Sequence, residues 1–346
     1  MNEDAIRASL AGLAGEDGKP LLAPEEVAQV AVEGGWACAV IARDGATKAL
    51  LTQVYQHLAA AFPGASIEVR GGQQVYRGGA GFGEGRHVVA VLGGKGGVGK
   101  STLSVNLALT LTAMNVPAGL LDADLNAPDI PHMLGVHLTS PPRGAGFRLG
   151  TPRLTPPAER RAPYERFDVE MMSVGFMLPE KLPPVVSTRM LVSSLLRYLI
   201  FEVAWKAEVV LIDAPPGTGE ELQVLARELP LSGALFVTTP QDLAQMDAER
   251  TLTLLTDHDV PVIGLVQNMA SLTCPHCNEE IDMFAQSSRL SEAGVPILGR
   301  IPFDVRLSRT ADQGLPLVLG DPRGPVAYEF ARIGSAVRRW LAERSA

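Results

Sequence analysis

The stretch VVAVLGGKGGVGKST, residues 88–102, constrains the fold more than any other part of the chain. Its first five residues are apolar and predict a buried strand, and apolar residues at helical spacing from Leu103 to Leu111 predict a helix directly after it. The residues between them match G-x-x-x-x-G-K-[ST], in which glycines let backbone N–H groups wrap around a phosphate. A strand, a glycine loop and a helix in this order predict a nucleotide phosphate site.

The residue types in this loop predict how the phosphates of a nucleotide and Mg²⁺ bind. Lys100 brings a full positive charge to the β- and γ-phosphates, and the hydroxyl of Ser101 is a ligand for Mg²⁺. A second lysine, Lys95, is either solvated or reaches the phosphates of a second subunit in a face-to-face dimer. We expect the nucleotide to be bound by Gly94, Lys95, Gly96, Gly97, Val98, Gly99, Lys100, Ser101 and Thr102.

Alternating strand and helix patterns predict an α/β protein whose main domain covers residues 86–346. Apolar runs at 88–92, 117–121, 207–212, 234–238, 262–266 and 297–301 predict strands, and helical patterns separate them. This order is typical of a mostly parallel, doubly wound sheet with helices on both faces. The exception is the Pro-, Gly- and Arg-rich stretch 137–185, which we expect to be a long surface insertion, with its arginines either solvated or forming a partner surface.

A small α/β domain is predicted over residues 1–70, with strands at 27–32, 36–41 and 66–69 and a helix at 46–61. Residues 71–85 contain seven glycines and predict a flexible linker. Cys38 lies inside an apolar run and is expected to be a small core residue.

Polar residues follow several of the predicted strands of the main domain, and the carboxyl ends of parallel strands are where ligands bind. Asp213 ends an apolar strand in the manner of a Walker-B carboxylate and is expected to assist Mg²⁺ binding. Asp122 and Asp124 follow another strand and, being two apart, point to the same side of an extended chain. We expect Asp124 to position the attacking water, and Asp122 is the second catalytic candidate; a solvated turn is the alternative for both.

Cys274-Pro275-His276-Cys277 is the other chemical feature of the sequence. Two thiolates are half of what a tetrahedral Zn²⁺ or a four-cysteine iron–sulfur cluster requires. The same motif on a symmetry mate would supply the other half across a two-fold interface. His276 as a further zinc ligand, a thioredoxin-like redox pair and two unligated thiols are the alternatives.

Charge and hydropathy exclude other classes of protein. The net charge of −8 and the pI near 5.4 disfavour a broad nucleic-acid-binding surface. The chain has no signal-peptide pattern at its start and no run of about 18 apolar residues, so we expect no membrane span. Three cysteines make no disulfide framework, which indicates the reducing cytoplasm. The amphipathic stretch 325–344 either packs on the sheet, which we expect, or binds a membrane.

Several motifs together resemble the Mrp/ApbC-type ATPases, cytosolic iron–sulfur cluster carriers within the MinD/ParA group of P-loop proteins. The matching stretches are GGKGGVGKST (93–102), DADLNAPD (122–129), IDAPPGTGE (212–220), VTTPQDLA (237–244), GLVQNMASLTCPHC (264–277) and LGRIPFDVRLSRTADQGLP (298–316).

This resemblance implies a homodimer that hydrolyses ATP slowly and holds a bridging [4Fe-4S] cluster on Cys274 and Cys277 of each subunit, for transfer to apo-proteins. It also implies that Lys95 acts across the dimer, that Asn268 recognises adenine, and that residues 1–70 are a degenerate version of a small domain found in the family. The alternatives are a MinD/ParA-like positioning ATPase on a membrane or DNA, and a dimer bridged by structural zinc.

Two segments depart from the family pattern. Asp-Leu-Asn-Ala-Pro-Asp (124–129) stands where Tyr-Gly-Pro-Ser usually follows the aspartates, and Val-Ser-Thr-Arg-Met (186–190) replaces a Trp-Arg-Gly-Pro segment. Both departures bear on the hydrolysis rate and on coupling to partners.

Overall fold

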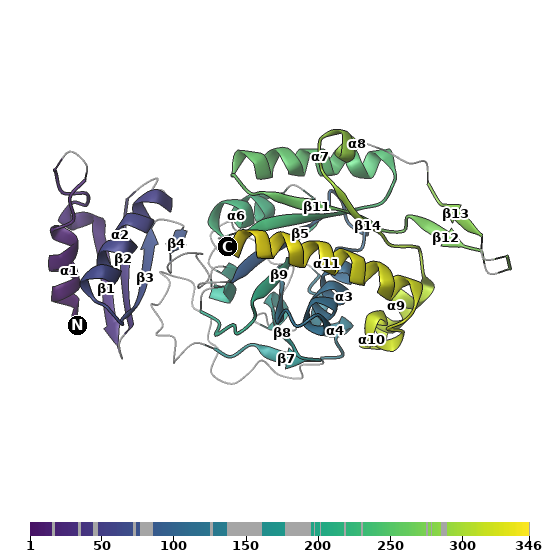
Figure 1. Ribbon diagram of the computed structural model, residues 1–346, viewed down its shortest axis with the longest axis horizontal. Coiled ribbons are helices and arrows are strands. Elements are labelled where there is room, and N and C mark those ends of the chain that lie inside the picture. Colours follow the sequence, from purple (N-terminus) through teal and green to yellow (C-terminus); the bar gives the residue numbers. More distant parts are fainter. Residues whose placement is uncertain are drawn as a thin grey trace. The chain divides into compact units, whose positions relative to one another are not determined.

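The computed structural model divides the chain into two compact units, the first mainly Met1–Arg86 and the second beginning at His87 (Figure 1). Both are described through residues 1–15, 18–33, 36–43, 48–71, 74–76, 86–124, 127–136, 161–176, 195–196, 198–200, 202–217, 219–229, 231–274, 276–277, 279–284 and 289–345. The departing segment 186–190 and most of the stretch 137–185 lie outside these ranges. No helix in this part of the chain has both the length and the apolar character needed to cross a bilayer.

The first unit is a four-stranded sheet in the order β1-β2-β3-β4, with a core formed by apolar residues of the sheet and of two helices, such as Leu10 and Val54. β1 and β2 are antiparallel, β2 and β3 parallel, and β3 and β4 antiparallel. Cys38 is fully buried, as expected of a core residue. The elements are α1 (Glu3–Ala11), η1 (Pro24–Glu26), β1 (Val27–Glu33), β2 (Trp36–Ile41), α2 (Lys48–Ala61), β3 (Ser66–Gly71) and β4 (Gln74–Tyr76).

Two features of this unit differ from the sequence interpretation. Helix α1 was not predicted, although Asn2 caps it by accepting a hydrogen bond from the Ala5 N–H at 2.9 Å. β4 lies within the segment 71–85 that we predicted to be a linker, since its residues pair with β3. Residues 77–85 of that segment lie outside the described ranges.

The second unit is built on an eight-stranded sheet in the order β14-β11-β10-β5-β9-β6-β8-β7. The strands are parallel from β14 to β8, and β7 is antiparallel at the edge. They are β5 (His87–Leu92), β6 (Ala118–Asp122), β7 (Tyr164–Arg166), β8 (Val169–Ser173), β9 (Val209–Asp213), β10 (Gly233–Thr238), β11 (Val262–Gln267) and β14 (Ile297–Arg300). This confirms the predicted α/β class with a mostly parallel sheet.

Helices cover both faces of this sheet, with α3 and α11 on one side and α6 and α7 on the other (Figure 1). The apolar stripe of α11 is buried, so the last helix packs on the domain, as we expected. The helices are α3 (Lys100–Ala113), α4 (Ile130–Met133), η3 (Val174–Phe176), α6 (Glu220–Glu228), α7 (Asp242–Asp257), α8 (Arg289–Glu292), α9 (Val305–Asp312), α10 (Leu317–Gly320) and α11 (Pro325–Ser345).

The expectation that residues 137–185 form a surface insertion was wrong for their last part. β8 pairs in parallel with β6 inside the main sheet, and its residues Val169, Met171 and Met172 are fully buried. The sequence did not indicate β8, a short apolar strand that completes one side of the core, because a long stretch rich in proline, glycine and arginine precedes it.

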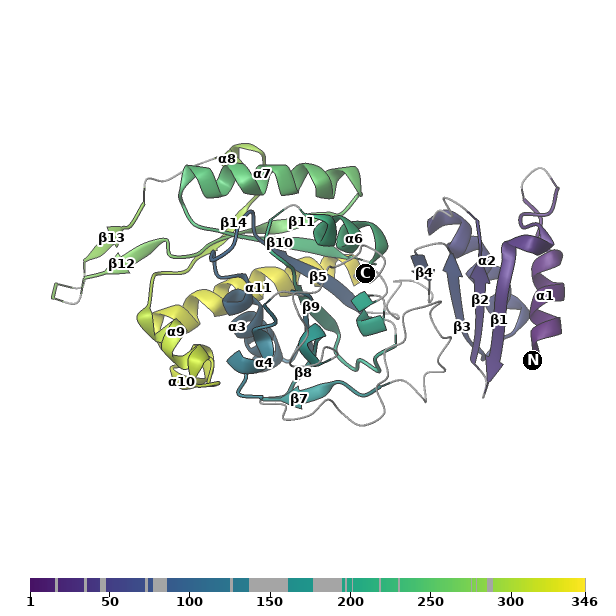
Figure 2. The ribbon, with the colours of Figure 1, turned by 180° about the vertical axis from the view of Figure 1, so that it is seen from behind.

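A separate hairpin leaves the carboxyl end of β11. It consists of β12 (Ser271–Thr273) and β13 (Glu280–Asp282), paired only with each other among the strands described. Figures 1 and 2 show it extending from the body of the second unit, with the turn between the two strands at its far end. A two-stranded hairpin is marginally stable alone, so its root must be held by the domain.

Candidate functional site

The glycine loop lies between β5 and α3, as predicted. Gly97 and Gly99 have φ angles of 75° and 92°, in the left-handed region that favours glycine. Gly99 is the N-cap of α3, and among the described residues no side chain caps this end. The first N–H groups of a helix have no partner within the helix, and the helix dipole adds positive charge there. The loop therefore has the backbone geometry and the positive charge that suit a phosphate.

Close backbone packing explains two other glycines of the loop. A Cβ atom on Gly93 would lie 2.7 Å from Cγ2 of Val98. A Cβ atom on Gly94 would lie 2.5 Å from the backbone nitrogen of Ala248 and 2.7 Å from Cβ of Asp247, both in α7. The loop thus rests directly on α7, and this contact leaves no room for a side chain.

Asp213 ends β9 behind the loop and is nearly fully buried. Its carboxylate accepts a hydrogen bond from Ser104 Oγ at 3.1 Å and another from the side chain of Ser101. Burial raises the pKa of Asp213 to about 6, while Ser101 and the nearby positive charge of Lys100 act in the opposite direction. A carboxylate in this environment favours a bound cation. The sequence analysis did not single out Ser104, whose role depends on the packing of α3 against β9.

Asp122 lies opposite Asp213 on the neighbouring strand β6 and has no exposed surface. It accepts hydrogen bonds from Ser173 Oγ at 3.1 Å and from the backbone N–H groups of Ile130 and Asp124 at 3.3 Å. Burial and the negative charge of Asp213 hold the pKa of Asp122 well above its usual value. In this structure Asp122 joins β6, β8 and the start of α4, and its catalytic role stays a prediction.

Asp124 lies nearer to solvent than Asp122. Its Oδ1 accepts a hydrogen bond from the Ala127 N–H at 3.1 Å, and its charge contributes to the raised pKa values of Asp213 and Asp129. The carboxylates of Asp122, Asp124 and Asp213 thus gather at the carboxyl ends of β6 and β9, beside the phosphate loop.

The second lysine of the loop contacts its own chain. Lys95 Nζ donates a hydrogen bond to Oε1 of Gln241 at 3.3 Å, and Gln241 is the N-cap residue of α7. Lys95 is half-buried, so its side chain lies against the protein in this conformation. The predicted role of Lys95 across a dimer requires this side chain to leave Gln241.

Asn268 follows β11 and joins it to the loop. Its Nδ2 donates a hydrogen bond to the carbonyl oxygen of Val98 at 2.9 Å, and its backbone N–H donates to Thr238 at 2.7 Å. Met269, in the left-handed region at φ 52°, then turns the chain toward β12, which begins at Ser271. The phosphate loop and the cysteine hairpin are therefore connected through three residues.

Cys274 and Cys277 lie at the far end of the hairpin, apart from the nucleotide site. The backbone N–H of Cys274 donates to the Glu279 carbonyl at 2.8 Å, which extends the β12–β13 pairing by one residue. Backbone N–H groups of Cys277 and His276 are directed at the Cys274 sulfur and lower its pKa. This turn stabilises a thiolate, the form that binds metals.

The chain does not complete a metal site around these thiols within its described part, where no group of three or more His, Cys, Asp or Glu side chains is placed to hold an ion. Cys277 is exposed, and its Sγ lies 3.9 Å from Oε2 of Glu279. Two thiols at an exposed turn fit a metal group that takes its other ligands from elsewhere.

Contacts with the loop after β14 hold the root of the hairpin. The Phe303 N–H donates to the Ser271 carbonyl at 2.7 Å, and Arg300 of β14 forms an ion pair with Asp282 of β13 at 3.2 Å. The hairpin is therefore fixed at its root and exposed at its tip.

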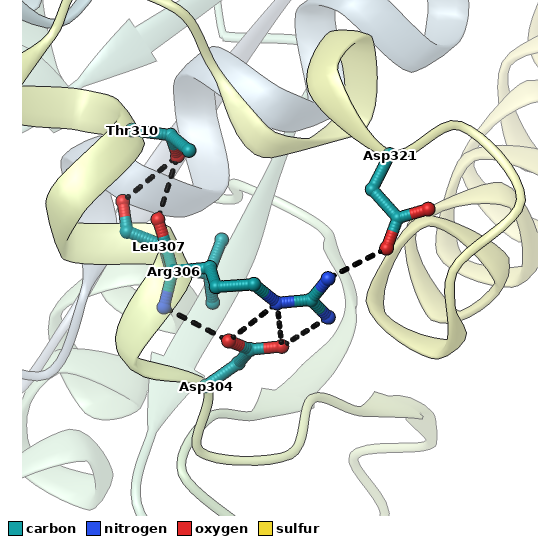
Figure 3. Close-up of polar contacts among 5 residues, drawn as sticks. All are labelled: Asp304, Arg306, Leu307, Thr310 and Asp321. Carbon is teal, nitrogen blue, oxygen red and sulfur yellow. Dashed lines mark hydrogen bonds and ion pairs between the residues drawn. The ribbon is translucent and has the colours of Figure 1, made fainter.

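Figure 3 shows the ion-pair network that fixes the next segment. The Arg306 guanidinium lies between the carboxylates of Asp304 and Asp321, with N–O distances of 2.7 Å to each. Asp304 also caps α9 by accepting from the Arg306 N–H, and Thr310 donates to the Arg306 carbonyl. This network joins the start of α9 to the turn before α11.

Helices α4 and α9 meet at their C-terminal ends through two glycines. Gly135 and Gly314 both have φ angles of 67°, and a Cβ atom on Gly135 would lie 3.1 Å from the Gly314 carbonyl oxygen. The start of α4 is held by Asp122 and the start of α9 adjoins the hairpin root, so the contact lies between these two regions.

Known proteins resemble this chain over most of its length. A family model described as the NUBPL iron-transfer P-loop NTPase (ParA) matches residues 84–338. The iron–sulfur cluster carrier protein of Methanocaldococcus jannaschii is 36% identical over 253 residues, which cover 72% of this chain and 82% of that protein. The iron–sulfur cluster transfer protein NUBPL of Mus musculus is 36% identical over 262 residues, covering 74% and 78%.

Solved structures share the fold. A nucleotide-binding protein from Archaeoglobus fulgidus in complex with ADP has a TM-score of 0.56 and 29% identity, over 70% of this chain and 91% of that one. The septum site-determining protein MinD from Pyrococcus horikoshii, with Mg-ADP, has a TM-score of 0.53 and 18% identity, over 75% and 98%. The second likeness concerns the fold alone.

Proposed function

Because the chain belongs to the NUBPL iron-transfer P-loop NTPase family, we propose that it is an ATPase that carries iron–sulfur clusters and transfers them to apo-proteins. One observation supports this most directly. A phosphate loop and a two-thiol turn occur in one domain, and Asn268 joins the loop to the strand that leads to the thiols.

The nucleotide half of the proposal assigns a task to each polar group of the site. The N-terminus of α3 and Lys100 bind the phosphates, and Asp124 orients the attacking water. The hydroxyl of Ser101 and the carboxylate of Asp213 are oxygen donors of the kind that Mg²⁺ prefers, and they are already hydrogen-bonded to each other. When bound there, Mg²⁺ neutralises negative charge on the phosphates. Asn268 is proposed to contact the adenine as well as the loop.

The carrier half of the proposal treats the cluster as cargo. Cys274 and Cys277 of two subunits hold one [4Fe-4S] cluster between them, because each chain supplies half of the four thiolates. The exposed tip lets an acceptor protein reach the cluster. In the ATP-bound homodimer, Lys95 leaves Gln241 and contacts the phosphates of the other subunit. Slow ATP hydrolysis reverses this arrangement and frees the cluster for transfer, in the cytoplasm, where thiols stay reduced.

The test is anaerobic reconstitution with iron and sulfide, followed by metal analysis and visible absorption spectroscopy. Wild-type protein should take up about four irons per dimer. Cys274→Ser with Cys277→Ser should take up none, and Cys38→Ser, a change at the buried cysteine, should behave as wild type. Zinc in anaerobically purified protein that resists replacement by iron would favour a structural dimer instead.

A further inference from the structure

The two faces of the β12–β13 hairpin differ in chemistry. One face carries only polar side chains, since strand alternation groups Ser271, Thr273, Glu280 and Asp282. The other face presents Leu272 and Ile281, which are directly opposite each other, and Met283 is the next residue on that side of an extended chain. These three side chains are 37%, 49% and 37% exposed.

The polar face contacts the domain near the root of the hairpin. Ser271 is buried, and Asp282 pairs with Arg300 of β14. The Phe303–Ser271 hydrogen bond fixes the root, and the three apolar side chains of the other face stay partly exposed. Exposed apolar side chains grouped on a fixed surface mark an interaction site.

Cys274 continues this face of the hairpin. Cys274 remains in register with Glu279 and lies two residues beyond Leu272, so strand alternation places both on the same side. A molecule that shares a metal group with Cys274 therefore meets the apolar pair next to it.

We propose that the apolar face of this hairpin, formed by Leu272, Ile281 and Met283, closes against the same face of a second copy of the chain and shields the shared metal group from water. The inference rests on the proposed cluster site and names the surface that retains the cluster there. Each copy supplies two thiols, and in the described part of the chain no group of three or more His, Cys, Asp or Glu side chains is placed to hold an ion. A two-fold axis brings a patch onto itself, so the second copy that supplies the missing thiols also supplies a matching apolar face.

The size of the face predicts when the two hairpins associate. Three side chains per copy form a patch far below the roughly 800 Å² per partner of a stable interface. The hairpins should therefore close only when a shared metal group adds its bonds. The apolar contact then acts mainly on how long the cluster is retained.

The experiment compares three full-length proteins after anaerobic reconstitution with iron and sulfide. Leu272→Thr with Ile281→Thr removes the apolar pair but keeps residues suited to strands. Thr273→Ser with Glu280→Gln changes the same two strands on the opposite face and is the matched control. The readouts are the dimer fraction by light scattering and the rate at which a ferrous chelator bleaches the cluster.

We expect the apolar-face variant to lose its cluster about tenfold faster than wild type, and to dimerise less, because burial of these side chains is lost. The control should match wild type. If the apolar-face variant retains its cluster and dimerises as wild type does, the proposal is overturned. This holds also if the variant only transfers its cluster to an acceptor protein more slowly, because the face would then bind acceptor proteins and not a second copy.

A second measurement separates failure of the surface from failure of the carrier function. If wild-type protein takes up no iron and sulfide, the carrier function is wrong, and Zn²⁺ alone becomes the shared ion in the same comparison. A zinc-dependent dimer that the apolar-face variant weakens still supports the surface. A zinc-dependent dimer of equal strength in all three proteins, or no dimer with either metal, overturns it.

Discussion

Asn268 Nδ2 donates a hydrogen bond to the carbonyl oxygen of Val98 at 2.9 Å, which joins the end of β11 to the middle of the phosphate loop. The two residues are 170 positions apart, and Asn268 is buried, so the bond fixes the loop against the sheet. Since β12 begins at Ser271, we expect a change in the loop on nucleotide binding to act at the root of the cysteine hairpin.

Replacing Asn268 should weaken nucleotide binding. In Asn268→Ala a buried carbonyl loses its donor, which costs about 1–3 kcal/mol, so affinity for ATP should fall about tenfold. Asn268→Asp places a carboxylate oxygen against the Val98 carbonyl and should bind still less tightly. Isothermal titration calorimetry at constant Mg²⁺ measures both. Wild-type affinity in the Asp variant would show that the amide donor does not matter.

The two lysines of the loop should separate binding from turnover. Lys100→Ala should abolish ATP binding, because this side chain alone brings a full charge to the phosphates of its own subunit. Lys95→Ala should change the affinity for ATP by no more than about twofold, because a partly exposed polar contact contributes little free energy. ATP hydrolysis, in contrast, should stop. Filter binding and phosphate release measure the two quantities. An equal loss of binding in both variants would contradict a role for Lys95 across the dimer.

The contact between Gly94 and α7 predicts a stability effect at one glycine but not at its neighbour. In Gly94→Ala the new Cβ atom overlaps the backbone at Ala248, so the free energy of unfolding should fall by about 1–3 kcal/mol. Gly96→Ala is the control, because the nearest atom to its Cβ, in Pro216, is 4.0 Å away. In urea denaturation, Gly94→Ala should therefore unfold at a lower midpoint than wild type, and Gly96→Ala should unfold at the wild-type midpoint. Equal midpoints for the two variants would mean that α7 shifts to accept the new Cβ atom without loss of stability.

The raised pKa of Asp213 predicts how Mg²⁺-ATP binding depends on pH. Asp213 has a pKa of about 6 in the absence of ligand, and only its charged form favours the cation. Above pH 6 the carboxylate is charged and affinity should be level, while below pH 6 protonation competes and affinity should fall about tenfold per unit. Asp213→Asn should bind weakly and lose this component of the pH dependence. If the wild-type profile matches that of the Asn variant between pH 5 and 7, ionisation of Asp213 does not control Mg²⁺-ATP binding.

The sequence predicted the phosphate loop and its sheet because their signals are local. All six residues of β5 are buried, five of them, residues 88–92, form a continuous apolar run, and the glycines of the loop follow directly. The resemblance to the Mrp/ApbC-type carriers, drawn from the spacing of several such motifs, is confirmed by the family model and by the relatives.

Contacts that depend on which strands are neighbours could not be predicted in this way. β6 lies between β9 and β8, an order that differs from the order along the chain. The bonds of Ser173 to Asp122 and of Ser104 to Asp213 follow from it. The Lys95–Gln241 contact likewise needs α7 to begin beside the loop, and nothing in either local sequence indicates the pairing.

The meeting of Gly135 with Gly314 has a mechanical consequence. Two backbones that touch without side chains between them have no flexible group that can absorb a displacement. A shift of α4 by a few tenths of an ångström would therefore displace α9 as well. A structural change at the carboxylates beside the phosphate loop would thus reach the root of the hairpin without local unfolding of the segments between them.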